Sequence, residues 1–296
     1  MAFQIVSDMA ADVGGEILRE FPEIVFVPMQ VSFGEETRTY GPGGDLDTGT
    51  FYQRLRGGEF AVTAPISPIV FRRVFEQVLR EGKDVLYLGL SGGLSESFQA
   101  ASLAASMLGE LYPQRRILTV ETFCASVGLA LLVRAAAEKQ QEGMNLDALV
   151  SWVEENRRHV CHWFTVEAFD HLKHGGRVSG AEAAIGTLLN IRPLLCMGED
   201  GTLKVMEKPM GSRRAMLRQV ACMNGNWMKE KGRLVLISHA DDEEAAGKLK
   251  EAVLKEHPDA DVRTVCAGPV IGTHTGPGML CLVFWGRKRQ LGLPEN

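Results

Sequence analysis

The sequence predicts an α/β protein of two domains: a parallel-sheet α/β domain, then a smaller α/β domain with a mixed or antiparallel sheet. Its 296 residues are enough for two domains of ordinary size. Residues 84–141 alternate apolar strands with helices rich in small residues, and this order is typical of a parallel sheet. From Cys161 onward the pattern changes, and a hairpin turn at Asp200-Gly201 joins two strands.

Hydrophobic periodicity and capping signals predict the elements of the first domain. Ser67 and Pro68 mark a helix start, because serine caps a helix and proline suits its first position. Residues 33–46 are rich in glycine and charge without a helical period, so we expect a loop or a ragged hairpin there. The expected elements are strands at 3–7, 24–31, 84–90 and 116–122, and helices at 12–20, 49–56, 67–81, 97–111 and 125–141.

An amphipathic helix over 145–159, capped by Asn145, is predicted to link the two domains, which we place at 1–159 and 160–296. No repeat or low-complexity segment occurs in the sequence. The expected elements of the second domain are strands at 162–166, 193–197, 234–238, 262–265 and 279–285, and helices at 181–189, 212–229 and 243–255.

Composition and charge exclude several classes of protein. Apolar residues make up 45% of the chain and charged residues 23%, as in soluble globular proteins. The net charge of −5 argues against nucleic acid as the main partner, since binding it requires a basic face. The first residues do not resemble a signal peptide, and no uncharged apolar run approaches the roughly 20 residues of a membrane span. The six cysteines form no CxxC pair, so we expect free thiols in a reducing cytoplasm.

Residues 268–278 read GPVIGTHTGPG, with four glycines and two prolines. Because proline lacks an N–H and glycine leaves the backbone loose, we predict a shaped loop between two strands rather than a helix. His274, Thr273 and Thr275 could donate hydrogen bonds to an anion, together with the N–H groups of the loop. An ordinary tight turn with an incidental histidine is the alternative.

Two further glycine turns are candidates for binding an anion. The stretch 91–97, SGGLSES, follows a strand and opens a helix, where N–H groups and the helix dipole favour negative charge. Arg177 lies beside a double glycine in HLKHGGRVSG, and its planar fork suits a carboxylate or phosphate. Thr63, Ser91 and Ser95 fall at or just past predicted strand ends, where ligands of parallel sheets bind. No cofactor or metal is expected, since the histidine pairs at i, i+3 lack a third ligand.

A serine hydrolase is a competing interpretation. Residues 89–93 satisfy the G-x-S-x-G pattern of a nucleophile elbow at Ser91, and Asp241 and His274 follow in the order of a triad. The pattern is short, no HGGG-type oxyanion motif precedes it, and Asp241 also suits a helix start. Hydrolysis is therefore the minority interpretation, beside a binder of another small carboxylate or phosphate.

Four motifs together resemble the DegV family of bacterial fatty-acid-binding proteins: TAPISP at 63–68, SGGLSES at 91–97, LKHGGRVSG at 172–180 and GPVIGTHTGPG at 268–278. The resemblance spans nearly the whole chain. It implies the two-domain fold of that family, with a long-chain fatty acid between the domains. It also implies a cytoplasmic, non-enzymatic carrier and a partner, a fatty acid kinase that phosphorylates the bound carboxylate to an acyl phosphate.

The resemblance assigns binding roles to polar residues from separate turns. The residues that it places around the carboxylate are Thr63, Ser91, Ser95, Arg177, His274 and Thr275. It places Arg213 or Arg214 near the helix that meets the kinase.

Several positions depart from the family pattern. Gly92 replaces the second serine of a serine pair, which removes an expected carboxylate donor. Residues 64–66 differ from the usual TSQPS, Met9 follows Asp8 where the family has serine, and Glu121-Thr122 replaces a later Asp-Ser pair. We therefore expect Gly92→Ser to tighten fatty acid binding by roughly 1 kcal/mol, one ordinary hydrogen bond.

Overall fold

The computed structural model describes residues 2–12, 20–178 and 190–289. The first sheet holds four strands that are all parallel, as predicted for the first half of the chain. Its strands in spatial order are β2 (Val25–Val27), β1 (Phe3–Asp8), β6 (Asp84–Leu88) and β7 (Ile117–Val120). The prediction of a parallel-sheet α/β region is therefore confirmed.

The second sheet holds six strands and is mixed, which confirms the other half of the fold prediction. Its strands in spatial order are β10 (Leu203–Glu207), β9 (Leu194–Met197), β8 (Val160–Thr165), β13 (Leu280–Trp285), β11 (Leu234–His239) and β12 (Asp261–Cys266). Only the β11–β12 pair is parallel among the described pairings of this sheet.

A third, small sheet contains β4 (Glu36–Tyr40), β3 (Met29–Phe33) and β5 (Val62–Ala64). The hairpin alternative for residues 33–46 is confirmed, because β3 and β4 pair antiparallel. The single strand predicted at 24–31 was wrong. Pro28 separates β2 from β3, and the two strands belong to different sheets, since proline cannot donate to a ladder.

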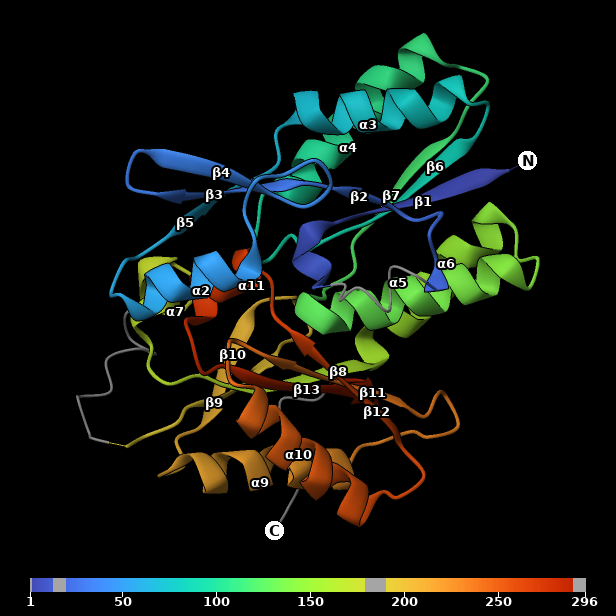
Figure 1. Cartoon of the computed structure of the whole chain (residues 1–296). Helices are drawn as coiled ribbons and strands as arrows, with labels where there is room; N and C mark the ends of the chain where they lie inside the picture. Colours follow the sequence, from blue (N-terminus) through green and yellow to red (C-terminus); the bar gives the residue numbers. More distant parts are fainter. Residues whose placement is uncertain (1, 13–19, 179–189, 290–296) are drawn as a thin grey trace.

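The helices lie in layers around the two large sheets (Figure 1). One pair lies above the parallel sheet, a second lies between the two large sheets, and a third lies beneath the six-stranded sheet. In that order the pairs are α3 (Pro68–Arg80) with α4 (Ser97–Leu111), α5 (Ser126–Gln141) with α6 (Leu146–Asn156), and α9 (Ser212–Asn224) with α10 (Glu243–Glu256). The short helices α2 (Thr48–Arg56) and α7 (Asp170–His174) lie at one side, and the 3-10 turns are η1 (Met9–Ala11) and η2 (Arg157–His159).

The small residues of α5 allow it to pack closely between the two large sheets. Its buried residues include Gly128, where an added Cβ would lie 1.8 Å from His162 Nε2 of β8. One continuous apolar cluster runs from the parallel sheet through α5 to the inner face of the six-stranded sheet. A second cluster lies between that sheet and α9 and α10. Strand β8 supplies both clusters by alternation, with Phe164 on the inner face and Trp163 on the outer face.

The loop predicted at 268–278 was wrong in its central part, where Pro269–Thr275 forms a short helix, α11. Pro269 occupies the first turn, where no N–H is needed, and Gly268 is the extended N-cap. Gly276 ends the helix with a φ of 72°, a conformation that favours glycine. Gly272 costs helix propensity but permits close packing, because an added Cβ would lie 2.6 Å from Tyr52 Oη.

The remaining predictions for the helices have mixed outcomes. Asn145 caps α6 as expected, with its side chain accepting from the N–H of Ala148 at 3.0 Å. Ser67 is the N-cap of α3, although its side chain makes no capping bond. The helices expected at 12–20 and 181–189 lie almost entirely outside the described residues. Within the described part of the chain, no helix has both the length and the apolar character needed to cross a bilayer.

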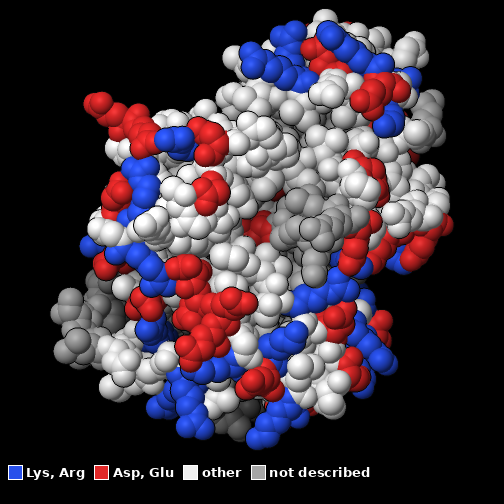
Figure 2. All heavy atoms as spheres, in the orientation of Figure 1, with Lys and Arg blue, Asp and Glu red and all other residues white. Residues whose placement is uncertain are grey.

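Acidic and basic side chains are interspersed over the face of the molecule shown in Figure 2. The domain division at residues 159 and 160 stays a prediction. The six-stranded sheet begins at Val160, but the larger apolar cluster contains residues from both sides of that division.

Candidate functional site

A largely apolar cavity lies between the parallel sheet and the six-stranded sheet, and its atom-free space of about 740 Å³ includes open solvent at the mouth. The apolar and sulfur-containing side chains that line it are Met29, Leu90, Leu94, Ala125, Phe164, Leu172, Met197, Leu203, Val270, Ile271, Met279 and Cys281. Its polar lining residues are Thr63, Ser95, Ser126, His162, Arg177, His274 and Thr275.

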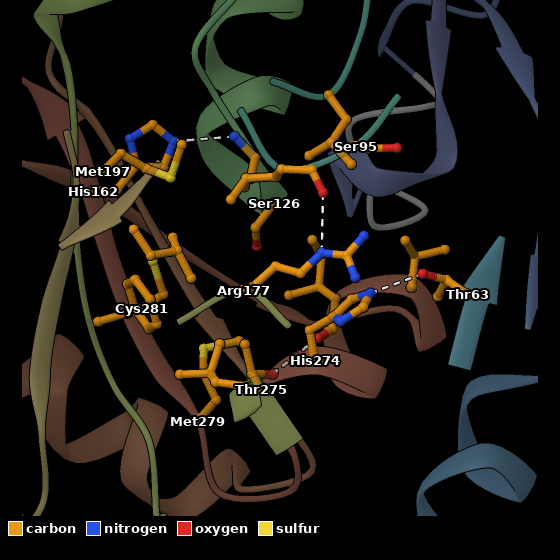
Figure 3. Close-up of a pocket in the computed structure, with 18 of the residues that line it drawn as sticks. Thr63, Ser95, Ser126, His162, Arg177, Met197, His274, Thr275, Met279 and Cys281 are labelled. Atoms are coloured by element: carbon orange, nitrogen blue, oxygen red, sulfur yellow. Dashed lines mark hydrogen bonds between the residues drawn. The ribbon is translucent and has the colours of Figure 1, made fainter. Parts of the chain in front are cut away.

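Thr63 and His274 meet at one end of the cavity (Figure 3). Thr63 lies in β5, His274 lies in α11, and Thr63 Oγ1 is 2.8 Å from His274 Nε2. Burial, together with the nearby charge of Arg177, lowers the pKa of His274 to about 3. The imidazole is therefore neutral, and its buried Nδ1 has no hydrogen-bond partner among the described residues.

Arg177 extends across the same end of the cavity and faces His274 (Figure 3). It follows Gly175 and Gly176, and the latter has a φ of 69° that lets the chain turn after α7. Its Nε donates to Leu94 O at 3.0 Å, and its Nη1 donates to Gly175 O. Burial alone lowers the pKa of its guanidinium. No carboxylate within the described chain forms an ion pair with it.

An uncompensated guanidinium at a partly buried position favours an anionic ligand, because charge removed from water needs a partner. The neutral imidazole of His274 and the hydroxyl of Thr63 add hydrogen-bonding groups without a competing negative charge. This end of the cavity can therefore hold a carboxylate. No three His, Cys, Asp or Glu side chains of the described residues are grouped as metal ligands.

The polar side chains elsewhere in the cavity bond to the protein itself. Ser126 Oγ donates to Asp12 Oδ2 at 2.6 Å, and Thr275 Oγ1 donates to Ile271 O at 3.0 Å. His162 Nδ1 donates to Val160 O at 3.1 Å, and burial holds the pKa of His162 well below its usual value. This part of the cavity is therefore effectively apolar.

Ser91 does not line the cavity, although the resemblance placed it at the carboxylate. It is completely buried, and its Oγ donates to Gly201 O at 2.8 Å while accepting from the N–H of Gly93 at 3.2 Å. Gly201 lies in the turn between β9 and β10. The hydroxyl thus fastens the 91–97 turn to the six-stranded sheet.

Gly92 and Ser95 lie in an outer pocket that adjoins the cavity. The N–H of Gly92 donates to Glu121 Oε2 at 2.8 Å, so Glu121, which directly follows β7, holds this turn in place. Ser95 lines both the cavity and the outer pocket, and its Oγ lies 3.0 Å from Ser97 Oγ. Of the two, only Ser95 can contact a ligand in the cavity.

The residues of the alternative hydrolase triad have separate partners. Ser91 bonds to the Gly201 carbonyl, Asp241 pairs with Arg56 at 2.5 Å, and His274 bonds to Thr63. No hydrogen bond in the described structure joins any two of the three residues. The three residues therefore do not form a hydrogen-bonded triad.

Arg213 and Arg214 are exposed at the start of α9, on the far side of the six-stranded sheet from the cavity. Arg213 lines a groove between α9 and α10 that also contains acidic residues. Neither arginine contributes to the cavity or to the outer pocket.

Sequence reasoning missed most of the apolar lining, including Phe164, Met197 and Cys281. All three lie in strands of the six-stranded sheet. Strand alternation carries this information only once the face that meets the ligand is known. Asp12 had no signal beyond its position as the first residue of the helix expected at 12–20.

Comparisons with known proteins identify relatives over nearly the whole chain. The model of the DegV family matches residues 2–287. A DegV domain-containing protein of Clostridium perfringens is 32% identical over 288 residues, which cover 97% of this chain and 99% of that protein.

Two solved structures are also similar. A fatty-acid-binding DegV family protein from Thermus thermophilus is 29% identical with a TM-score of 0.84, over 97% of this chain and 100% of that one. A stearic acid-binding protein from Eubacterium ventriosum is 25% identical with a TM-score of 0.85, over 97% of this chain and 98% of that one. This chain belongs to the DegV family, as its sequence shows over nearly its whole length and as its fold agrees.

Proposed function

We propose that this chain binds a long-chain fatty acid and presents its carboxylate to a partner fatty acid kinase for acyl phosphate formation. The observation that carries the binding half is the pairing of an apolar cavity with one end that holds an uncompensated guanidinium. The relatives from Thermus thermophilus and Eubacterium ventriosum bind fatty acids, which supports the same ligand here.

The geometry supports one orientation of the ligand. The carboxylate lies at Arg177, Thr63 and His274, and the acyl chain runs toward Met197 and Met279. Burial of each methylene contributes about 0.8 kcal/mol, so a long chain supplies on the order of 10 kcal/mol before the costs of binding.

The kinase half of the proposal rests on the family resemblance and on the position of the head group. Arg177 and Ser95 line both the cavity and the outer pocket, so a carboxylate beside them is next to the surface. No hydrogen bond joins a serine to a histidine at this end among the described residues, which supports the role of a carrier rather than a catalyst. Exposed Arg213 and Arg214 are the proposed contacts for the kinase.

Native mass spectrometry of the protein purified from bacteria tests the binding half. We expect a bound acid of a few hundred daltons that denaturing extraction releases. Stripped protein should then take up palmitate in isothermal titration calorimetry. An empty protein that also ignores added palmitate would refute the proposal.

The kinase half is tested with a fatty acid kinase from the same organism and labelled ATP. We expect acyl phosphate only when loaded carrier and kinase are both present. Replacing Arg213 and Arg214 with serine should lower the rate while palmitate affinity is unchanged, because neither residue lines the cavity. Equal rates for the two proteins would remove these arginines from the proposed interface.

A further inference from the structure

The outer pocket is a second, more polar space directly outside the mouth of the cavity. Four residues line both spaces: Leu94, Ser95, Arg177 and Leu203. The remaining residues of the outer pocket are Pro65, Gly92, Gly93, Glu96, Gly176, Val178, Thr202 and Lys204. A group attached to a carboxylate at Arg177 would therefore enter this pocket.

Two segments that are distant in sequence supply most of the lining of the outer pocket. They are the 91–97 turn and the start of β10 with Thr202 before it, and residues 176–178 and Pro65 complete the lining. The bond from Ser91 Oγ to Gly201 O fixes the distance between these two segments. Close contact of the two turns requires glycine, because a Cβ on Gly93 would lie 2.7 Å from Gly201 O. The pocket is consequently a preformed feature of the fold.

Two cationic side chains line the outer pocket, Arg177 and Lys204. Lys204 projects from β10, and its Nζ lies 3.0 Å from Asp200 Oδ2, so its charge is partly shared. Arg177 has no acidic partner among the described residues. Glu96 is the acidic side chain of the described lining, and it is exposed. A ligand with more negative charge than a carboxylate would satisfy both cations.

We propose that the outer pocket is the site of the phosphoryl group once the bound acid has become an acyl phosphate, with Lys204 as the side chain that distinguishes the product from the acid. This inference rests on the proposed function. The acyl chain and the carbonyl keep their places at Thr63 and His274, and the added dianionic group extends outward between Arg177 and Lys204. Lys204 contacts only the added group, because it does not line the cavity.

The test compares two ligands on stripped protein by calorimetry. One is palmitate, and the other is the methylene phosphonate analogue of palmitoyl phosphate, in which CH₂ replaces the bridging oxygen and blocks hydrolysis. We expect Lys204→Met to weaken phosphonate binding about three- to fivefold, as for a partly exposed charge pair, and to leave palmitate binding unchanged. Lys204→Arg should restore phosphonate affinity.

Lys208→Met is the matched control, because Lys208 is exposed just past β10 and lines neither space. It should bind both ligands as the parent protein does. Equal affinities of the parent and Lys204→Met for the phosphonate would overturn the inference, as would a parent protein that binds palmitate and rejects the phosphonate. Failure of the parent to bind palmitate would refute the proposed function itself.

Discussion

The two ends of the cavity treat polar groups in opposite ways. At the mouth, Arg177 donates to the backbone carbonyls of Leu94 and Gly175, and no carboxylate of the described residues compensates its charge. At the far end, Ser126 and His162 direct their hydrogen bonds into the protein, to Asp12 and to Val160. Both ends contain polar residues, so composition alone does not distinguish the two ends. The hydrogen-bond partners of those residues distinguish them.

This difference sets the direction of the ligand. An anionic head group gains a partner at the mouth and would find only satisfied groups at the far end. An acyl chain has no hydrogen bonds to lose on entering the cavity, and Phe164, Met197 and Met279 of the lining provide apolar and sulfur contacts for it. The proposed direction of the ligand can be tested at each end of the cavity, by changing the ligand or by changing the protein.

The largest expected effect comes from shortening the acyl chain, which tests the far end. Laurate has four methylenes fewer than palmitate, so we expect a loss of about 3 kcal/mol, roughly 100-fold in Kd. Calorimetry or competition with a fluorescent fatty acid measures the series. Equal affinities for the two acids would show that the cavity does not bury the end of the chain.

Removing the charge of Arg177 tests the mouth. Arg177→Met keeps much of the apolar stem and deletes the donors, so we expect palmitate to bind about 10-fold more weakly. Hexadecanol, which lacks the carboxylate, should bind the parent and the variant alike. A matching loss for hexadecanol would instead mean that the substitution had damaged the cavity.

Sequence reasoning anticipated the residues at the mouth better than the shape around them. Thr63, Arg177 and His274 stood out because each follows or lies within a glycine- or proline-rich turn, and the structure brings them to one end of the cavity. Ser91 shared that signal, yet its hydroxyl bonds to Gly201, a partner 110 residues away that no local pattern reveals.

The fold itself was largely predictable, since strand and helix periods are local properties. The α/β class and the mixed second sheet were confirmed, whereas α11 was not foreseen. Proline and glycine oppose helix formation in isolation, but burial of Val270 and packing of Gly272 against Tyr52 offset that cost. Tertiary contacts of this kind cannot be seen from propensity.

Asp12 allows a sharper test of the far end, where the polar groups have a structural role. The pKa of Asp12 is raised to about 7 because burial outweighs two hydrogen bonds that lower it, one from Ser126 and one from the N–H of Gly268. Between about pH 4 and pH 7 the folded state binds the extra proton, so stability contributed by this group falls as pH rises through that window.

The substitution Asp12→Asn keeps the shape, removes the titration and suits the φ of 46° at this position. We expect the variant to gain on the order of 2 kcal/mol relative to the parent between pH 5 and pH 8. Urea unfolding at both pH values measures this, and palmitate affinity should not change. A difference between the proteins that is independent of pH would contradict the assignment.

The smallest expected effect concerns Gly92, where structure and sequence lead to different expectations. An added Cβ would lie 2.5 Å from Glu121 Oε2, and the two oxygens of Glu121 accept from the N–H groups of Gly92 and Phe123. Gly92→Ser therefore displaces this carboxylate, and we expect it to lower the free energy of unfolding by about 1 kcal/mol. Adding Glu121→Asp shortens the acid and should recover part of that loss, a coupling that a double-mutant cycle detects.

Gly92 lines the outer pocket and not the cavity. Gly92→Ser, Glu121→Asp and the double variant should therefore all bind palmitate within about twofold of the parent. Tighter palmitate binding by Gly92→Ser alone would instead support the expectation drawn from the family pattern and place this position at the mouth.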